Sequence, residues 1–155
     1  MRLRTANRAI LFAYNFRHLL RGITMADLGY NISSKEDLQT VYKTIEDELK
    51  VVGQCSVTRK GNINLTPKAR YNNILTKAEP IEGIIRQTRD GEYEVNLIYS
   101  TSATMSCWAA FFFGIWIFGL GIIFPIFPYF IARKKIAGDL QKALAMAEQQ
   151  LDSGD

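Results

Sequence analysis

The longest uncharged run in the chain extends from Cys107 to Ala132 and constrains the fold more than any other feature. It covers about 26 residues, CWAAFFFGIWIFGLGIIFPIFPYFIA, whereas about 20 apolar residues suffice for a helix to cross a bilayer. A small soluble domain cannot enclose a helix that is apolar on every face. The sequence therefore predicts that residues 105–132 form a membrane anchor and that the protein is an integral membrane protein.

Aromatic side chains lie along this run, and three cations follow it directly. Trp and Tyr rings favour the membrane–water interface, and Arg and Lys resist entry into the hydrocarbon. The residues that we expect to form the anchor are Trp108, Phe111, Phe112, Phe113, Trp116, Phe118, Phe124, Tyr129, Arg133, Lys134 and Lys135. The run contains no ionisable side chain, which argues against a proton relay or a charged ion pathway.

Two topologies are compatible with the anchor. In the first, a single transmembrane helix is kinked near Pro125 and Pro128, and the cations after it place the C-terminal tail in the cytoplasm. The N-terminal domain would then have to cross the membrane, although no secretory signal precedes it. In the second, a re-entrant helical hairpin bends near Gly119 and Gly121 and leaves domain and tail on one side. We favour the single pass from sequence, because a bend inside lipid leaves backbone amides without partners.

Residues 25–104 have the pattern of a small α+β domain. An amphipathic helix is expected over about 34–52, with Ser33 and Glu36 as a capping box and Gly53 as the residue that ends it. Its apolar stripe keeps a three-four spacing and consists of Leu38, Val41, Tyr42, Ile45, Leu49 and Val52. This helix is expected to cover one face of a sheet.

Alternating apolar and polar residues predict the strands of that sheet. A first strand is expected at 26–32, a hairpin turns at Lys60 and Gly61, and a second hairpin turns at Asp90 and Gly91. A short helix is expected after Thr66 and Pro67. The predicted fold class is therefore α+β, with a small, mostly antiparallel sheet of three to five strands covered by one or two helices.

Two segments flank these parts. Residues 1–24 hold five Arg and no acidic residue, and we expect either a disordered extension that folding does not need or a stretch outside the native protein. A helix on the membrane surface is the alternative. Residues 133–155 form an amphipathic tail with Leu140, Leu144 and Leu151 at near-helical spacing. We expect this tail to be a solvated helix; pairing with another tail or contact with the membrane surface are the alternatives.

The domain has few of the side chains that catalysis or metal binding usually requires. The only histidine of the chain is His18, and Cys55 and Cys107 have the character of small apolar residues rather than of a disulfide framework. We therefore expect no catalytic residues, no metal site and no cofactor. Residues 25–104 hold ten basic and eleven acidic side chains, so no nucleic-acid partner is expected either.

The sequence thus favours a membrane-anchored, non-catalytic interaction or accessory protein. Its expected partners are the lipid bilayer and either another protein or a second copy of this chain. A small membrane-active protein of the pore-forming or holin-like kind is one alternative. A lipid-modifying membrane enzyme is another, for which Glu82 or Cys55 would be the residues to test.

Overall fold

The computed structural model describes residues 25–118 and 123–153. These residues form a six-stranded antiparallel sheet packed against helices, which confirms the predicted α+β class but has more strands than the three to five expected. The elements, in chain order, are β1 (Met25–Ser33), α2 (Leu38–Leu49), β2 (Gly53–Val57), β3 (Asn62–Pro67), the 3-10 helix η1 (Ala69–Tyr71), β4 (Thr76–Ala78), β5 (Ile81–Arg89), β6 (Glu92–Ala103), α3 (Met105–Phe118) and α4 (Ile123–Asp152).

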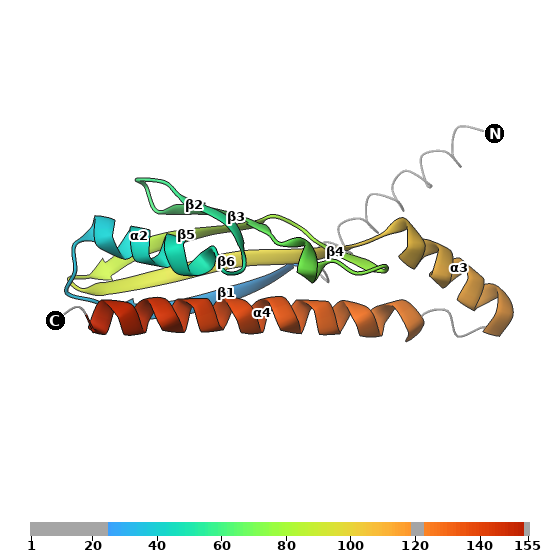
Figure 1. Ribbon diagram of the computed structural model, residues 1–155. Coiled ribbons are helices and arrows are strands. Elements are labelled where there is room, and N and C mark those ends of the chain that lie inside the picture. Colours follow the sequence, from blue (N-terminus) through green and yellow to red (C-terminus); the bar gives the residue numbers. More distant parts are fainter. Residues whose placement is uncertain (1–24, 119–122, 154–155) are drawn as a thin grey trace, which may run out of the picture.

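Strand β6 is the longest strand and organises the sheet. The strand order is β1-β6-β5-β3-β2, so β6 has β1 on one side and β5 on the other. The short strand β4 pairs with the last residues of β6, with Ala78 opposite Thr101. This pairing extends the sheet toward α3, which begins two residues after β6 ends (Figure 1).

Both predicted hairpin turns are present. Gly61 follows Lys60 between β2 and β3 and has a φ of +79°, and Gly91 follows Asp90 between β5 and β6 with a φ of +81°. Residues with a side chain rarely adopt this left-handed backbone conformation, so glycine is required at both points. The turns fix the register of the paired strands, and the predicted strand at 26–32 is also confirmed as β1.

One face of the sheet is apolar and is covered by α2 and α4 (Figure 1). On β6 the alternation is regular, since Tyr93, Val95, Leu97 and Tyr99 are buried and the residues between them are more exposed. Helix α2 contributes Val41, Ile45 and Leu49 among other buried side chains, as its predicted apolar stripe required. The core therefore lies between the sheet and these two helices.

The predicted capping of α2 is wrong. The helix begins at Leu38, and its N-cap is Asp37, whose carboxylate accepts a hydrogen bond of 3.1 Å from the backbone N–H of Gln39. Ser33 belongs to β1, and Gly53 begins β2 instead of ending the helix. An N-cap aspartate satisfies a free amide as well as serine does, so the pattern alone did not fix the first turn.

The predicted helix after Thr66 and Pro67 is also wrong. Only the single turn η1 forms, and β4 follows it. The side-chain oxygen of Asn72 accepts from the N–H of Ala78 at 2.9 Å, and that of Asn73 accepts from the N–H of Thr76 at 2.6 Å. These bonds satisfy backbone amides in an extended chain, and they compete successfully with a helix.

The C-terminal tail differs most from expectation. The prediction of a solvated helix is wrong, because Ile136, Leu140 and Leu144 in α4 are at most 1% exposed and belong to the same core as the sheet. Helix α4 packs against α2, β1 and β6. Residues 25–104 alone would leave that apolar face of the sheet partly uncovered, so the packed unit includes the second half of α4.

The uncharged run is divided between two helices. Helix α3 ends at Phe118 and α4 begins at Ile123, and residues 119–122 between them lie outside the described residues. Within the described ranges, no helix combines the length and the apolar character needed to cross a membrane. The predicted bend at Gly119 and Gly121 and the predicted extension at residues 1–24 lie outside the described residues.

Replacement of Leu140 by Ala tests the role of α4. Leu140 is fully buried, so the lost apolar contacts and the cavity should lower the free energy of unfolding by about 2–5 kcal/mol. Chemical denaturation in mild detergent, followed by circular dichroism, measures this loss. Met146→Ala on the exposed side of the same helix is the control and should change the free energy by less than about 0.5 kcal/mol. Equal effects of the two variants would contradict the packing described.

Candidate functional site

The predicted anchor residues lie on the two helices beyond the end of the sheet. Helix α3 carries Trp108, Phe111, Phe112, Phe113, Trp116 and Phe118, and α4 carries Phe124, Tyr129, Arg133, Lys134 and Lys135. The structure describes the side chains of Trp108, Phe112, Phe113 and the three cations. The side chains of Phe111, Trp116, Phe118, Phe124 and Tyr129 lie outside the described part.

Large apolar side chains on both helices are exposed. Phe112 and Phe113 on α3 are 65% and 66% exposed, and Phe130 and Ile131 on α4 are 60% and 58% exposed. The sequence prediction did not single out Phe130 and Ile131, although they belong to the same uncharged run. Helices α3 and α4 contact each other. We call α3 together with residues 123–132 of α4 the apolar hairpin.

Both ends of the apolar hairpin are fixed to the same domain. At the first end, the N–H of Thr104 donates to the carbonyl oxygen of Leu75 at 3.0 Å, and its hydroxyl donates to the carbonyl of Ile74. At the second end, the guanidinium of Arg133 donates to the carbonyl oxygen of Met25 at 2.8 Å. Ile136, less than one turn further along α4, is buried in the core. The chain therefore leaves and re-enters the domain at one end of the sheet.

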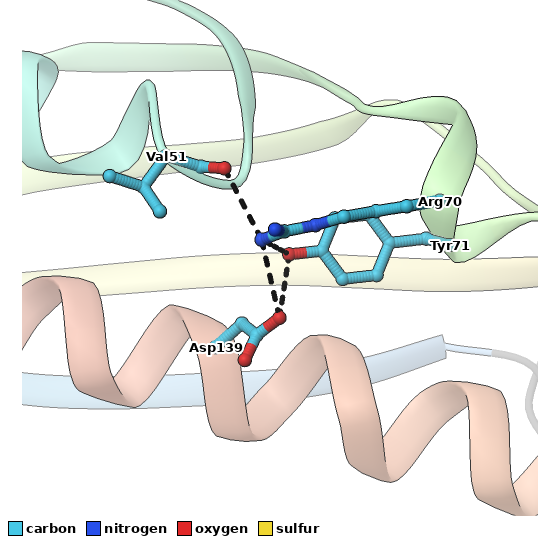
Figure 2. Close-up of polar contacts among 4 residues, drawn as sticks. All are labelled: Val51, Arg70, Tyr71 and Asp139. Carbon is cyan, nitrogen blue, oxygen red and sulfur yellow. Dashed lines mark hydrogen bonds and ion pairs between the residues drawn. The ribbon is translucent and has the colours of Figure 1, made fainter.

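A group of polar side chains holds α4 against the domain, as Figure 2 shows. The Tyr71 hydroxyl donates to the carboxylate of Asp139 at 2.8 Å, and the Arg70 guanidinium donates to the Tyr71 oxygen at 2.7 Å. Arg70 also reaches the carbonyl oxygen of Val51 at 3.3 Å and Asp139 at 3.5 Å. We call Val51, Arg70, Tyr71 and Asp139 the Tyr71 cluster. It joins η1, α4 and the connection between α2 and β2.

The electrostatics of the Tyr71 cluster favour an uncharged phenol. Burial raises the pKa of Tyr71 above its usual range, the hydrogen bond from Arg70 acts against that, and the hydrogen bond to Asp139 raises it further. The protonated hydroxyl remains a donor to Asp139 well above neutral pH. The ammonium of Lys135 lies 5.9 Å from the centre of the Tyr71 ring, so two positions one turn apart on α4 reach the same tyrosine.

Cys55 and Glu82, the two residues named for an enzymatic alternative, lie on opposite faces of the sheet. Cys55 lies on the buried face of β2, and burial raises the pKa of its thiol to about 12, so the nucleophilic thiolate does not form at neutral pH. Glu82 is exposed on the opposite face of the sheet, because its neighbour Ile81 pairs with Leu65 and shares the buried face with Cys55. Cys107, the other cysteine, is also buried and free.

Within residues 25–118 and 123–153, no three His, Cys, Asp or Glu side chains gather as a metal site requires. An open surface cleft of about 470 Å³ lies where α2 begins, beside the turn between β5 and β6, and it is lined by Ser34, Lys35, Glu36, Asp37, Leu38, Gln87, Asp90, Gly91 and Tyr93. Its lining is polar and open to solvent, unlike the enclosed apolar pockets that hold small molecules.

Comparison with known proteins does not identify a family for this chain. No family model matches this chain, and no curated protein matches it. Among solved structures, a conserved protein from Geobacillus kaustophilus is similar over 77% of this chain and 96% of that chain, with 12% sequence identity and a TM-score of 0.31. This degree of similarity supports no argument about function.

Replacement of Tyr71 by Phe tests the Tyr71 cluster. The variant removes the donor to Asp139 and should lower the free energy of unfolding at neutral pH by about 1–3 kcal/mol. Because folding raises the pKa of Tyr71, its contribution is complete below the unfolded pKa of about 10 and is lost as the pH rises through the folded pKa. The difference between parent and variant should therefore narrow above about pH 10.

Denaturation curves at a series of pH values measure this difference. Tyr30→Phe is the matched control, since the Tyr30 hydroxyl also donates to a carboxylate of α4, Glu148, at 2.8 Å but is less buried. Tyr30→Phe should lower the free energy of unfolding by less than Tyr71→Phe does. A Tyr71→Phe variant as stable as the parent at neutral pH would show that the cluster does not hold α4.

Proposed function

We propose that this protein is a membrane-attached, non-catalytic accessory protein, held by the apolar hairpin and presenting its sheet to a partner at the membrane surface. The observation that carries the proposal is the exposure of large apolar side chains on both arms of the hairpin, such as Phe112 and Phe130. They lie within a run of about 26 uncharged residues. Exposure of so large an apolar surface to water is unfavourable, whereas its burial in the hydrocarbon of a bilayer is favourable.

The packing of α4 supports attachment by a hairpin rather than by a single crossing. A single crossing would place Thr104 and Arg133 on opposite sides of the membrane. Both residues are bonded to the same domain, and Leu140 and Leu144 are buried within it. Only a segment that enters and leaves on one side keeps these contacts. This is the re-entrant topology, which the sequence alone ranks below the single crossing.

The lengths of the two arms fit partial insertion. Helix α3 has 14 residues, which corresponds to about 21 Å, and the uncharged part of α4 corresponds to about 15 Å, against about 30 Å of hydrocarbon. In this arrangement Trp108 and the cations after Ala132 lie at the interface, where such side chains are favoured. We further place the domain and the tail together in the cytoplasm, because Arg and Lys at the end of a membrane segment favour that side.

The face of the sheet opposite α2 and α4 is the surface that we propose for a protein partner. Its side chains include Asn31, Asn64, Glu82 and Ile98, all exposed. Ile98 is a large apolar residue in the middle of this polar face, flanked by Asp27 and Glu82 on the neighbouring strands. A mixed surface of this kind is typical of non-obligate protein interfaces, and a second copy of the chain is one candidate.

Phe130→Asp tests the attachment. In fractionation, the parent should stay with membranes through alkaline carbonate and be released by detergent. A charge at an exposed position of the apolar hairpin should move a substantial part of the protein into the carbonate supernatant, because the charge must enter the hydrocarbon. Met146→Asp, at a position of similar exposure on the same helix but in the folded domain, is the control and should behave like the parent. Release of the unaltered protein by carbonate would contradict the proposal.

Chemical labelling from one side tests the topology separately. A single cysteine is placed at Lys43 on α2 or at Gln149 on α4, both exposed positions, and sealed membranes are treated with a maleimide that does not cross them. The hairpin predicts that both positions react from the same side. The native Cys55 and Cys107 are buried, so the parent should react slowly until it is unfolded. Reaction from opposite sides would establish a single crossing instead.

A further inference from the structure

Cations gather at the end of the domain that carries the apolar hairpin. Arg133, Lys134 and Lys135 directly follow its second arm. Lys77 on β4 is paired with Ser102, two residues before Thr104 begins the approach to the first arm. Arg70 stands beside Tyr71, whose ring Lys135 also approaches. We call Arg70, Lys77, Arg133, Lys134 and Lys135 the basic cluster.

Two of the carboxylates near the basic cluster are occupied within the domain. Glu79 accepts a hydrogen bond from the hydroxyl of Ser102, and Asp139 accepts from Tyr71 and Arg70. A third carboxylate, Asp27, is exposed two residues along β1 from Met25, and Lys77, Lys134 and Lys135 are exposed to solvent. The five cations of the cluster against these three carboxylates leave an excess of two positive charges.

The opposite end of the domain carries charges of both signs. The turn between β5 and β6, the residues before α2 and the end of α4 carry five acidic residues, Glu36, Asp37, Asp90, Glu92 and Asp152, and two cations, Lys35 and Arg89. Arg59, in the turn between β2 and β3, also lies beside the first turn of α2, and Lys60 follows it. Strand β6 runs between the two ends, and its 12 residues correspond to roughly 37 Å. Figure 1 shows the two ends, with α3 at one and the C-terminal end of α4 at the other.

We infer that the basic cluster binds the head groups of anionic phospholipids, so that the protein prefers membranes with a negative surface. This inference rests on the proposed membrane attachment and names the lipid class for it. When the hairpin is inserted, Thr104 and Arg133 lie at the interface. Lys77 and Lys134 are then within about 10 Å of the head groups, a distance over which surface charges attract at physiological salt.

Flotation of the full chain with vesicles tests the inference. Protein in detergent is diluted into vesicles of phosphatidylcholine alone or of phosphatidylcholine with phosphatidylglycerol, at low and at high salt. The parent should partition more strongly into the anionic vesicles at low salt, and the preference should fall at high salt. The variant Lys77→Gln with Lys134→Gln should reduce that preference by about 25-fold, at about fivefold for each cation lost at the surface.

A matched control separates position from net charge. The variant Lys43→Gln with Lys60→Gln removes two exposed cations from α2 and from the turn between β2 and β3, and it should keep the preference of the parent. Circular dichroism confirms that both variants are folded. Equal partition of the parent into both kinds of vesicle, or equal losses in the two variants, would overturn the inference and leave the proposed attachment intact. Failure to float with either kind of vesicle would overturn the attachment itself.

Discussion

The packing of the second half of α4 onto the sheet is the contact on which the rest of the structure depends. Ile136, Leu140 and Leu144 close the core that β6 and α2 leave open on one side. The same contact returns the chain to the domain after the uncharged run. Without it, the sheet would lose part of its core, and the cations that follow the run would not be held beside the start of β1.

Polar bonds along α4 reinforce this packing at several points. Arg133 bonds to Met25 at the start of β1, Asp139 to Tyr71 in η1, and Glu148 to Tyr30 further along β1. Most of the free energy comes from the buried apolar side chains, because exposed polar pairs contribute little. The polar bonds fix which turn of the helix lies against which strand. They therefore define where the apolar hairpin leaves the domain.

The local patterns of the sequence predicted local structure well. The stripe from Leu38 to Val52 identified α2, and the glycines at 61 and 91 identified the two hairpins, because in each case the physical requirement lies within a few residues. The helix predicted after Thr66 and Pro67 does not form, because the side chains of Asn72 and Asn73 accept hydrogen bonds from backbone amides several residues away. Helix propensity does not reveal such bonds.

The candidate site was predicted in part. The uncharged run predicted which aromatic residues lie beyond the end of the sheet. Whether the chain returns to the domain after the run depended on whether Leu140 and Leu144 are solvated or buried. An amphipathic helix has the same spacing in both cases. The partner of its apolar face is a sheet that lies far earlier in the chain: Leu28 in β1 and Leu151 in α4 belong to the same core and are 123 positions apart. No local signal in the sequence specifies such packing.

The place of α4 after all six strands has a consequence for biosynthesis. The ribosome completes all six strands and the apolar run before it makes the residues that close the core. Until then the sheet exposes an apolar strip, a state that is prone to aggregation. The uncharged run also leaves the ribosome before the residues that close the core. We therefore expect the final folding step to wait until the second half of α4 has been made.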